Sequence, residues 1–307
     1  MVTMPGTSHQ GPLDEFSNDE ETLAIELRRD VEMLAGTIGE RNVRDPEALA
    51  RSADYLAGEF EAVSLAVERQ EYDVDGVPCQ NIIAEIRGAE KASEIIVVGG
   101  HYDSVVGCPG ANDNASGVAT TLALARRFSS TRPARTLRFV AFVNEEPPYF
   151  QTEEMGSLVY ARACKERGDH VVAMLSMETM GYYTEEENSQ QYPFPLSAYY
   201  PSTGNFIGFV GNIKSRDLVR RSVGLFRDKA DFPSEGAAIF AGIPGVGWSD
   251  HWSFWQAGYP ALMVTDTAPF RYPHYHEVED TPDKIDYERL ARVVTGLYEV
   301  IRDLANE

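Results

Sequence analysis

Apolar and β-branched runs recur along the chain, and polar or charged positions separate them. The runs at 95–98, 137–143 and 171–175 have the length and composition of buried strands. Longer stretches between these runs space their apolar residues as amphipathic helices do. This alternation predicts an α/β fold built on a mostly parallel β-sheet.

Turn and cap signals divide the chain into further elements. Helices are expected at 20–37, 45–60, 116–128, 153–167, 214–229 and 283–304, and strands at 63–73, 80–87, 206–210 and 261–265. We expect residues 1–20 to form a mobile acidic tail and residues 21–307 to form a single α/β domain. A long loop at about 183–205 interrupts this domain, and a loop of that length is usually functional or mobile.

The chain carries 48 acidic and 27 basic residues, which gives a formal net charge of −21. This charge argues against nucleic acid or an anionic membrane as a partner, because both attract Lys and Arg. The polar beginning of the chain does not resemble a signal peptide. The three cysteines lack CxxC spacing and suit a reducing compartment, so a cytoplasmic protein is expected. The sequence sets no oligomeric state.

Histidine and acidic side chains follow three of the expected strands. His101 and Asp103 follow the first, Glu145 and Glu146 the second, and Glu178 the third. In parallel sheets, ligands bind outside the carboxyl ends of the strands, so these side chains should meet at one edge. The imidazole of a metal-bound His usually donates its second N–H to a carboxylate, and Asp103 is placed to receive it.

Two further candidates lie in loops. An Asp in the position of Asp113, just before a helix, is usually an N-cap or part of an Asx turn. Beside the other candidate ligands, we interpret Asp113 as a carboxylate shared by two metal ions. His274 and His276 alternate along the chain, so only one of them should face the metal.

These residues predict a metal centre made of His and carboxylate groups without thiolates. This chemistry suits zinc, with manganese or cobalt as substitutes, and two His with three carboxylates can hold two ions. Glu145 and Glu146 point to opposite sides of an extended segment, so one can bind metal while the other reaches a water molecule. A carboxylate beside a metal-activated water is suited to act as a general base.

The motifs as a set resemble the M28 family of co-catalytic zinc peptidases. They occur in the family order and cover most of the chain beyond residue 80: GGHYDS (99–104), PGANDNASG (109–117), NEE (144–146), SME (176–178), SDH (249–251) and YHEVEDTPDKID (275–286). The resemblance implies a central mixed sheet sandwiched between helices. Many aminopeptidases of this family carry Asp where this chain has Glu178.

By position, the resemblance assigns each metal ligand. His101, Asp113 and Glu178 would hold one zinc ion, and Asp113, Glu146 and His276 would hold the other. Glu145 would be the general base. The activity expected is that of an aminopeptidase that removes N-terminal residues from peptides or dipeptides.

Two other functions are compatible with the resemblance. A glutaminyl-cyclase-like acyltransferase would work with one zinc ion, and a non-catalytic binding module is expected to have lost metal ligands. Because all the proposed ligands are present, we expect the binding module least.

The substrate pocket is expected in the aromatic segments of the C-terminal third. Phe270 and Tyr272 are candidates to line it, with Trp252, Phe254 and Trp255, although ordinary core packing explains Trp252 and Phe254 equally well. Arg271 is a candidate to hold the free carboxylate of a dipeptide.

Overall fold

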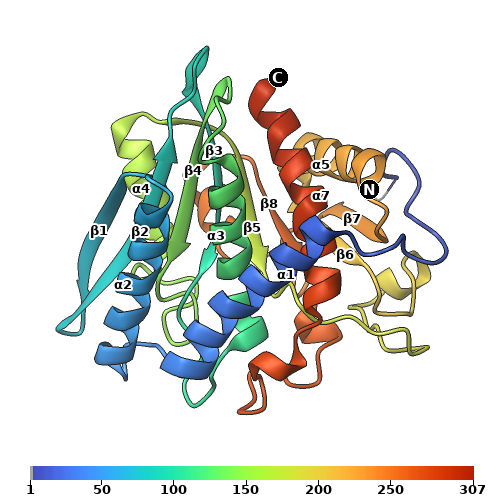
Figure 1. Cartoon of the computed structure of the whole chain (residues 1–307), viewed down its shortest axis with the longest axis horizontal. Helices are drawn as coiled ribbons and strands as arrows, with labels where there is room; N and C mark the ends of the chain where they lie inside the picture. The colour runs from blue at the N-terminus through green and yellow to red at the C-terminus, as the bar shows by residue number, and fades with distance from the viewer. Residues whose placement is uncertain (1–2) are drawn as a thin grey trace.

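One mixed β-sheet spans the molecule (Figure 1). The computed structural model describes residues 3–307, and within this range the sheet has eight strands in the order β1-β2-β4-β3-β5-β8-β6-β7. The strands are β1 (Val67–Val74), β2 (Val77–Ile86), β3 (Lys91–His101), β4 (Arg135–Phe142), β5 (His170–Glu178), β6 (Ile207–Asn212), β7 (Ser234–Ile239) and β8 (Ala261–Thr265). The prediction of a mixed sheet between helices is confirmed.

Parallel pairing concentrates in the centre of the sheet, where the candidate ligands lie. β3 pairs in parallel with both β4 and β5, and β5 pairs in parallel with β8. β6 also runs parallel to β7, whereas β1 with β2, β2 with β4, and β6 with β8 are antiparallel. The carboxyl ends of β3, β4 and β5 therefore emerge side by side at one edge.

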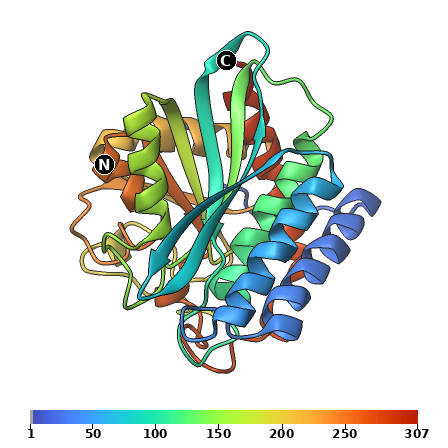
Figure 2. The same ribbon diagram turned by 90° about the vertical axis from the view of Figure 1, so that its left-hand side faces the viewer.

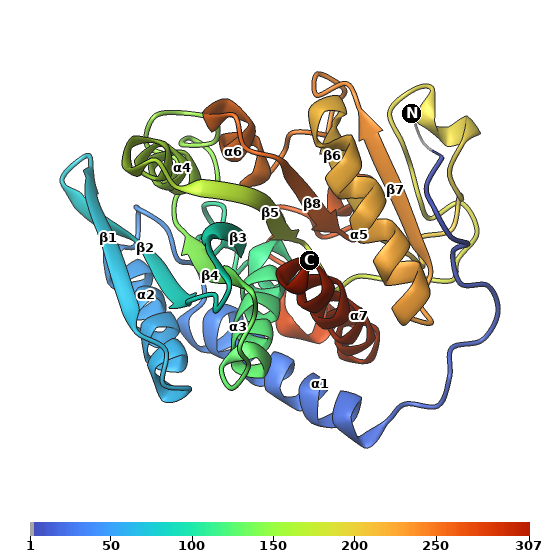
Figure 3. The ribbon, with the colours of Figure 1, turned by 90° about the horizontal axis from the view of Figure 1, so that it is seen from above.

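Helices cover both faces of the sheet (Figure 3). One face carries α1, α2, α3, α5 and α7, and the other carries α4 and α6. Their bounds are α1 (Asn18–Val31), α2 (Pro46–Ala62), α3 (Gly117–Phe128), α4 (Gly156–Arg167), α5 (Arg216–Lys229), α6 (His251–Ala257) and α7 (Tyr287–Asn306). Each helix turns an apolar stripe inward; on α7 the buried residues include Leu290, Val294, Leu297 and Ile301. The larger core lies beneath the first face.

Local sequence signals fix several boundaries. Ser17 and Glu20 form a reciprocal capping box that starts α1, because each side chain bonds the backbone N–H of the other. The β1–β2 hairpin turns at Asp75 and Gly76, which both have positive φ as this tight turn requires. Figure 2 shows this hairpin at the near edge of the sheet, beside the blue helices α1 and α2. A π-helical segment (Glu32–Ile38) continues α1, so the helix expected at 20–37 is found nearly whole.

The N-terminal segment, which the sequence predicts to be a mobile tail, lies against the domain. Met1 and Val2 lie outside the described residues, but the following residues run along α5 and the outer strand β7. The Ser8 hydroxyl accepts from the Ser234 N–H at 2.8 Å, and Arg227 donates to the Pro5 carbonyl at 3.3 Å. These contacts seat the segment on the domain, and α1 begins at Asn18, before the end of the expected tail.

The sequence also failed to predict β7 and α6.

No helix among residues 3–307 has the length and apolar character needed to cross a bilayer. All three cysteines of the described chain are buried free thiols, as the absence of CxxC spacing suggested.

Candidate active site

The candidate ligands meet at the carboxyl edge of the central strands. His101 is the last residue of β3, Glu178 is the last residue of β5, and Glu145 and Glu146 follow β4. Asp113 lies in the segment η2 (Ala111–Ser116) ahead of α3, at a kink where its backbone leaves helical geometry (φ −111°, ψ 90°). Parallel strands deliver the first four side chains to one place, as the pattern predicted.

The candidate ligand atoms form two groups that share Asp113. In the first, His101 Nε2 lies 3.3 Å from Asp113 Oδ1 and 3.4 Å from Glu178 Oε2. In the second, His276 Nε2 lies 3.1 Å from Asp113 Oδ2 and 3.3 Å from Glu146 Oε2. Zinc ligands sit about 2.0–2.1 Å from a tetrahedral ion, which places neighbouring ligand atoms about 3.3 Å apart. Both groups match this spacing.

Several polar atoms of the candidate ligands are buried and make no hydrogen bond. Among the residues described, His101 Nε2, Asp113 Oδ1, Glu146 Oε1 and His276 Nε2 are buried and lack a hydrogen-bond partner. Leaving a buried polar atom unpaired costs about 1–3 kcal/mol each. A cation bound by each group would satisfy these atoms together, so the residues present fit two metal ions.

The charges in the site explain the pKa values of its members. Burial alone would lower the pKa of His101, but the carboxylates of Glu178 and Glu145 raise it well above its ordinary value. Burial raises the pKa of Glu146 to about 7, and the neighbouring Asp113 carboxylate adds to this rise. Crowded acids in a site of low dielectric need nearby positive charge, which the two histidines supply only in part.

Asp103 fixes the segment that carries the paired glutamates. Its two carboxylate oxygens accept the backbone N–H groups of Glu145 and Glu146, each at 3.1 Å. His101 Nδ1 lies nearer to the Asp103 carbonyl oxygen, at 3.2 Å, than to its carboxylate, at 3.5 Å. The predicted imidazole partner is therefore chiefly the Asp103 backbone, and the carboxylate positions the glutamates instead.

Asp280 has the same role on the opposite side of the site. Its carboxylate oxygens accept the backbone N–H groups of Asn112, at 2.8 Å, and Asp113, at 3.1 Å. The Tyr272 hydroxyl donates to Asp280 Oδ1 at 2.8 Å, which fixes the rotamer of that carboxylate. The shared candidate ligand is thus held by a buried acid, as the glutamate pair is.

Two residues in the segments that carry the site have a left-handed backbone, and of these His276 directs its side chain at the candidate ligands. Asn144, which precedes the glutamates, has φ of 59°, and His276 has φ of 60°. A non-glycine residue in this region stores roughly 1 kcal/mol or more of strain. Asn tolerates the conformation well, whereas His276 has to be held by its surroundings, including Tyr275, whose ring stacks on it at 3.9 Å.

Glu145 lies beside the first group without belonging to either. Its Oε2 is 3.8 Å from His101 Nε2, and the residue is buried. Burial raises its pKa well above the ordinary value, while the nearby His101 lowers it and the Glu178 carboxylate raises it further. Glu178 itself accepts a 2.7 Å hydrogen bond from the Ser249 hydroxyl, which orients it. A buried carboxyl with a raised pKa is a stronger base than an exposed one, which suits it to accept a proton.

Arg41 supports the loops that carry the site. It is fully buried, and its guanidinium donates to the carbonyls of Tyr102 at 2.6 Å, Gly110 at 2.7 Å and Pro109. These carbonyls belong to the two segments that follow β3. Arg41 therefore joins the His101 strand end to the Asp113 loop, and it brings a positive charge close to the buried acids.

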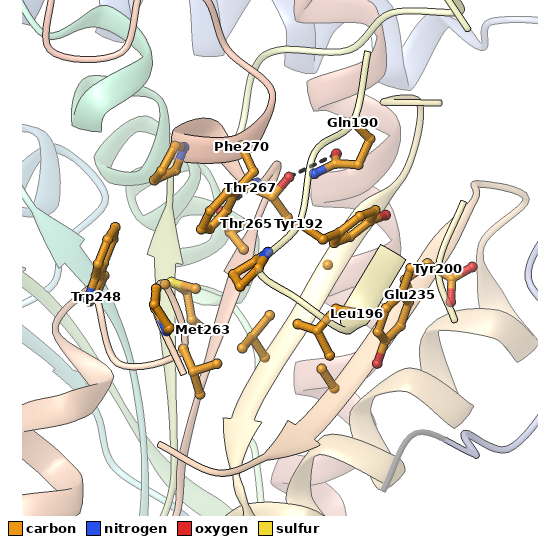
Figure 4. A pocket seen from close by; sticks show the side chains of 18 of the residues that line it. Gln190, Tyr192, Leu196, Tyr200, Glu235, Trp248, Met263, Thr265, Thr267 and Phe270 are labelled. Atoms are coloured by element: carbon orange, nitrogen blue, oxygen red, sulfur yellow. Dashed lines mark hydrogen bonds between the residues drawn. The ribbon is translucent and has the colours of Figure 1, made fainter. Parts of the chain in front are cut away.

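An apolar cavity opens beside the first group (Figure 4). It holds about 780 Å³ of empty space, part of it open to solvent, and is lined by both Glu178 and Tyr275. The long loop predicted at 183–205 forms one wall, through side chains that include Tyr192, Leu196 and Tyr200. This segment contains a short 3₁₀ turn, Leu196–Ala198, and its apolar side chains face β6 and β7 across the cavity.

The expected pocket residues are only partly at this cavity. Phe270 lines it, and so does Trp248, which the sequence analysis did not single out. Phe254 is fully buried in the core under α4 and α6, and Trp252 and Trp255 line a separate surface groove. Core packing therefore accounts for Phe254, and none of these three residues lines the cavity.

Arg271 differs from the predicted role. Its side chain is buried, and it donates to Gln190 Oε1 at 2.7 Å and to the Phe206 carbonyl at 2.9 Å. It therefore ties the long loop to β6 and does not present its charge to a substrate. Tyr272 is likewise turned to Asp280 and does not line the cavity.

The sequence did not predict three supporting residues. Ser249 lies in the SDH motif and Asp280 in the YHEVEDTPDKID motif, so closeness along the chain to candidate ligands was the one sign of their role. Arg41 stands in a polar segment without periodicity, and no local signal marks it.

Comparison with known proteins supports the family assignment. The model of peptidase family M28 matches residues 81–301. The uncharacterized protein YfbL of Escherichia coli (strain K12) is 37% identical over 281 residues, which cover 89% of this chain and 85% of YfbL. A probable zinc metalloprotease of Leptosphaeria maculans is 28% identical over 240 residues, covering 72% of this chain and 54% of the relative.

Solved structures share the fold at low sequence identity. The zinc aminopeptidase BSAP of Bacillus subtilis superposes with a TM-score of 0.75 at 17% identity, covering 95% of this chain and 97% of BSAP. A glutaminyl cyclase of Fimbriiglobus ruber gives a TM-score of 0.68 at 21% identity, covering 96% of this chain and 97% of the cyclase. The matched family model, together with the relatives, shows that this chain belongs to peptidase family M28, a family of zinc metallopeptidases.

Proposed function

We propose that this protein is an aminopeptidase that uses two zinc ions to remove N-terminal residues from peptides or dipeptides. The observation that carries the proposal is the pair of buried ligand groups that share Asp113, with Glu145 directly beside them. Manganese or cobalt would fit the same oxygen and nitrogen ligands.

Each ion would be held by one His and two carboxylates. His101, Asp113 and Glu178 would hold one, and Asp113, Glu146 and His276 would hold the other. When bound, zinc polarises a carbonyl group and lowers the pKa of a water molecule to near neutrality. The supporting carboxylates of Asp103 and Asp280 keep the ligand segments in place, which orients the site before substrate arrives.

Glu145 would move the proton. Its carboxylate would accept a proton from the attacking water and return it to the nitrogen of the leaving amine. Burial raises the pKa of Glu145 above the value of an exposed glutamate, which makes its carboxylate a stronger base for taking the proton of the water.

The apolar cavity next to Glu178 would receive the side chain of the N-terminal residue. Its lining is largely aromatic and aliphatic, so it favours an apolar side chain, which gains free energy when it leaves water. The acids of the site would attract the free ammonium group of the substrate, which suits an enzyme that acts at the amino end of a peptide.

A glutaminyl-cyclase-like activity is the second candidate, and the fold shared with the Fimbriiglobus ruber cyclase favours it. The two reactions differ in metal demand, since the cyclase activity is expected to need one zinc ion. The complete second ligand group, with Glu146 and His276, favours the peptidase.

Metal analysis with a substrate panel tests the proposal. The purified protein is expected to hold two zinc ions per chain and to cleave aminoacyl chromogenic substrates and dipeptides, with activity lost in chelator and restored by zinc. A protein with one ion that cyclises N-terminal glutamine and leaves these substrates intact would refute the peptidase. A cytoplasmic location is part of the proposal, and cell fractionation tests it.

A further inference from the structure

A second hollow opens beside the second ligand group. It holds about 500 Å³ of empty space, part of it open to solvent, and includes Asn42, Arg44, Asn144, Glu146 and Tyr149 in its lining. Glu146 belongs to the second ligand group, whereas Glu178 of the first group lines the apolar cavity. Each ligand group thus contributes one carboxylate to the lining of a different hollow.

Arg44 supplies the positive charge of this second hollow. Many arginines of this acidic protein are paired with carboxylates; Arg126, for example, lies 2.6 Å from both Asp30 and Glu59. Arg44 is exposed, and within residues 3–307 no carboxylate lies within ion-pair distance of its guanidinium. Its charge is therefore available to a ligand.

The backbone that carries Arg44 is fixed to the site. Asn42 donates to the Ser104 carbonyl at 3.0 Å and accepts from the Arg44 N–H at 2.9 Å. Immediately afterwards, Asp45 caps α2 by accepting from the Ala48 N–H at 3.0 Å. Arg44 thus projects from a short segment anchored at both ends, which limits the entropy lost when its side chain binds an anion.

Charge complementarity sets the direction of a peptide across the site. The ammonium end is attracted by the acids around Glu178 and Glu145 and repelled by Arg44. The leaving part of the peptide then lies in the hollow beside Glu146, which has room for one or two residues. A free carboxylate there faces Glu146 and Asp103, so it needs a cation to offset their repulsion, and Arg44 is the cation in the lining.

We infer that Arg44 binds the free C-terminal carboxylate of short peptides and so makes dipeptides and similar short peptides the preferred substrate class. This inference rests on the proposed peptidase function. Arginine suits the role because its planar guanidinium matches a carboxylate with two parallel hydrogen bonds. It takes over the role that the sequence suggested for the buried Arg271.

The test compares Leu-Ala with Leu-Ala amide on the zinc-loaded protein. Wild type is expected to have a kcat/KM about tenfold higher for the free acid. Arg44→Met should lower kcat/KM for the acid about tenfold, which corresponds to about 1.4 kcal/mol, and change the amide less than about twofold. Arg51→Met is the matched control, because Arg51 is exposed on α2, does not line the hollow and carries the same charge.

Calorimetry separates failure of this inference from failure of the peptidase proposal. The probes are a dipeptide isostere with a methylene group in place of the scissile carbonyl, and its C-terminal amide. Arg44→Met should weaken binding of the acid about tenfold and leave the amide unchanged, even if the protein hydrolyses no peptide. The inference is overturned if wild type binds acid and amide with equal affinity, or if Arg44→Met weakens the binding of both equally. Peptide cleavage that persists in either case would leave the peptidase proposal standing.

Discussion

Asp103→Asn should disable the site by moving the paired glutamates. The wild-type carboxylate accepts two successive backbone N–H groups, those of Glu145 and Glu146, each at 3.1 Å. Asparagine has one oxygen and one NH2 group, so one of the two N–H groups would face another donor. The substitution changes few atoms, yet it removes the feature that aligns both glutamates.

The size of the effect follows from these two contacts. A hydrogen bond to a charged group contributes about 1.5–3 kcal/mol, and one of the two is lost outright in the variant. If the whole of this free energy is lost from transition-state binding because Glu145 and Glu146 are misplaced, kcat/KM should fall roughly 10- to 150-fold, at about 1.4 kcal/mol per factor of ten. Zinc affinity should fall about 10- to 100-fold, as is typical when a group supporting a metal ligand is removed.

Three measurements on chelator-stripped and reloaded protein check this prediction: zinc affinity by calorimetry, kcat/KM on a leucyl chromogenic substrate, and the thermal unfolding temperature. Asp217→Asn, at an exposed position on α5, makes the same change in charge and should leave all three near wild type. A folded Asp103→Asn protein with zinc affinity and kcat/KM within twofold of wild type would refute the reasoning.

Three further predictions concern the site and its surroundings. Glu145→Gln should lower kcat at least about 100-fold while metal analysis still finds two zinc ions, because a general base is lost and no ligand is; near-normal turnover would exclude Glu145 as the base. His101→Ala should lose zinc together with activity, since it removes a ligand atom of the first group; retention of both ions would exclude that role. Burial raises the pKa of Asp266 from 3.8 to about 7, so the acid form is favoured in the folded state and stability is lost as pH rises from about 4 to about 7. Asp266→Asn should therefore flatten the fall in free energy of unfolding over this range in denaturant titrations, and an unchanged slope would contradict the assignment.

Strong periodicity made the central elements predictable. The strand expected at 261–265 has the bounds of β8, and the helix expected at 214–229 contains α5. By contrast, β7 reads Ser-Glu-Gly-Ala-Ala-Ile, whose small residues give little strand signal, and pairing with β6 stabilises it. The seven-residue helix α6 is too short to show a reliable helical period.

The candidate ligands were predictable because strand ends bring them together. His101, Glu146 and Glu178 each follow an apolar run, and a parallel sheet aligns those ends whatever the loops do. The groups that support the ligands were not predictable in the same way. Arg41 acts through backbone carbonyls 61–69 residues away, and such contacts depend on loop paths that local patterns do not encode.

The same reasoning explains why the substrate side was predicted least well. Aromatic content cannot distinguish Phe254, which fills the core, from Phe270, which lines the cavity, because both gain free energy by leaving water. Likewise, the charge of Arg271 gave no sign that carbonyls of the long loop and β6 would enclose it. Whether such a side chain lies in the core, at the cavity or in a loop contact depends on where the fold places it relative to the sheet.

Charge balance links the fold of this site to its metal. Buried carboxylates crowd around it in the described chain, from Asp103, Asp113, Glu145, Glu146, Glu178, Asp250 and Asp280. Burying an unpaired charge is expensive, and Arg41 is the buried guanidinium whose bonds reach these loops. Two divalent cations would supply four positive charges where the orphaned ligand atoms already converge. The acids that would make the site catalytic would therefore also make its folding depend on the metal, because the free energy of binding would offset the cost of bringing them together.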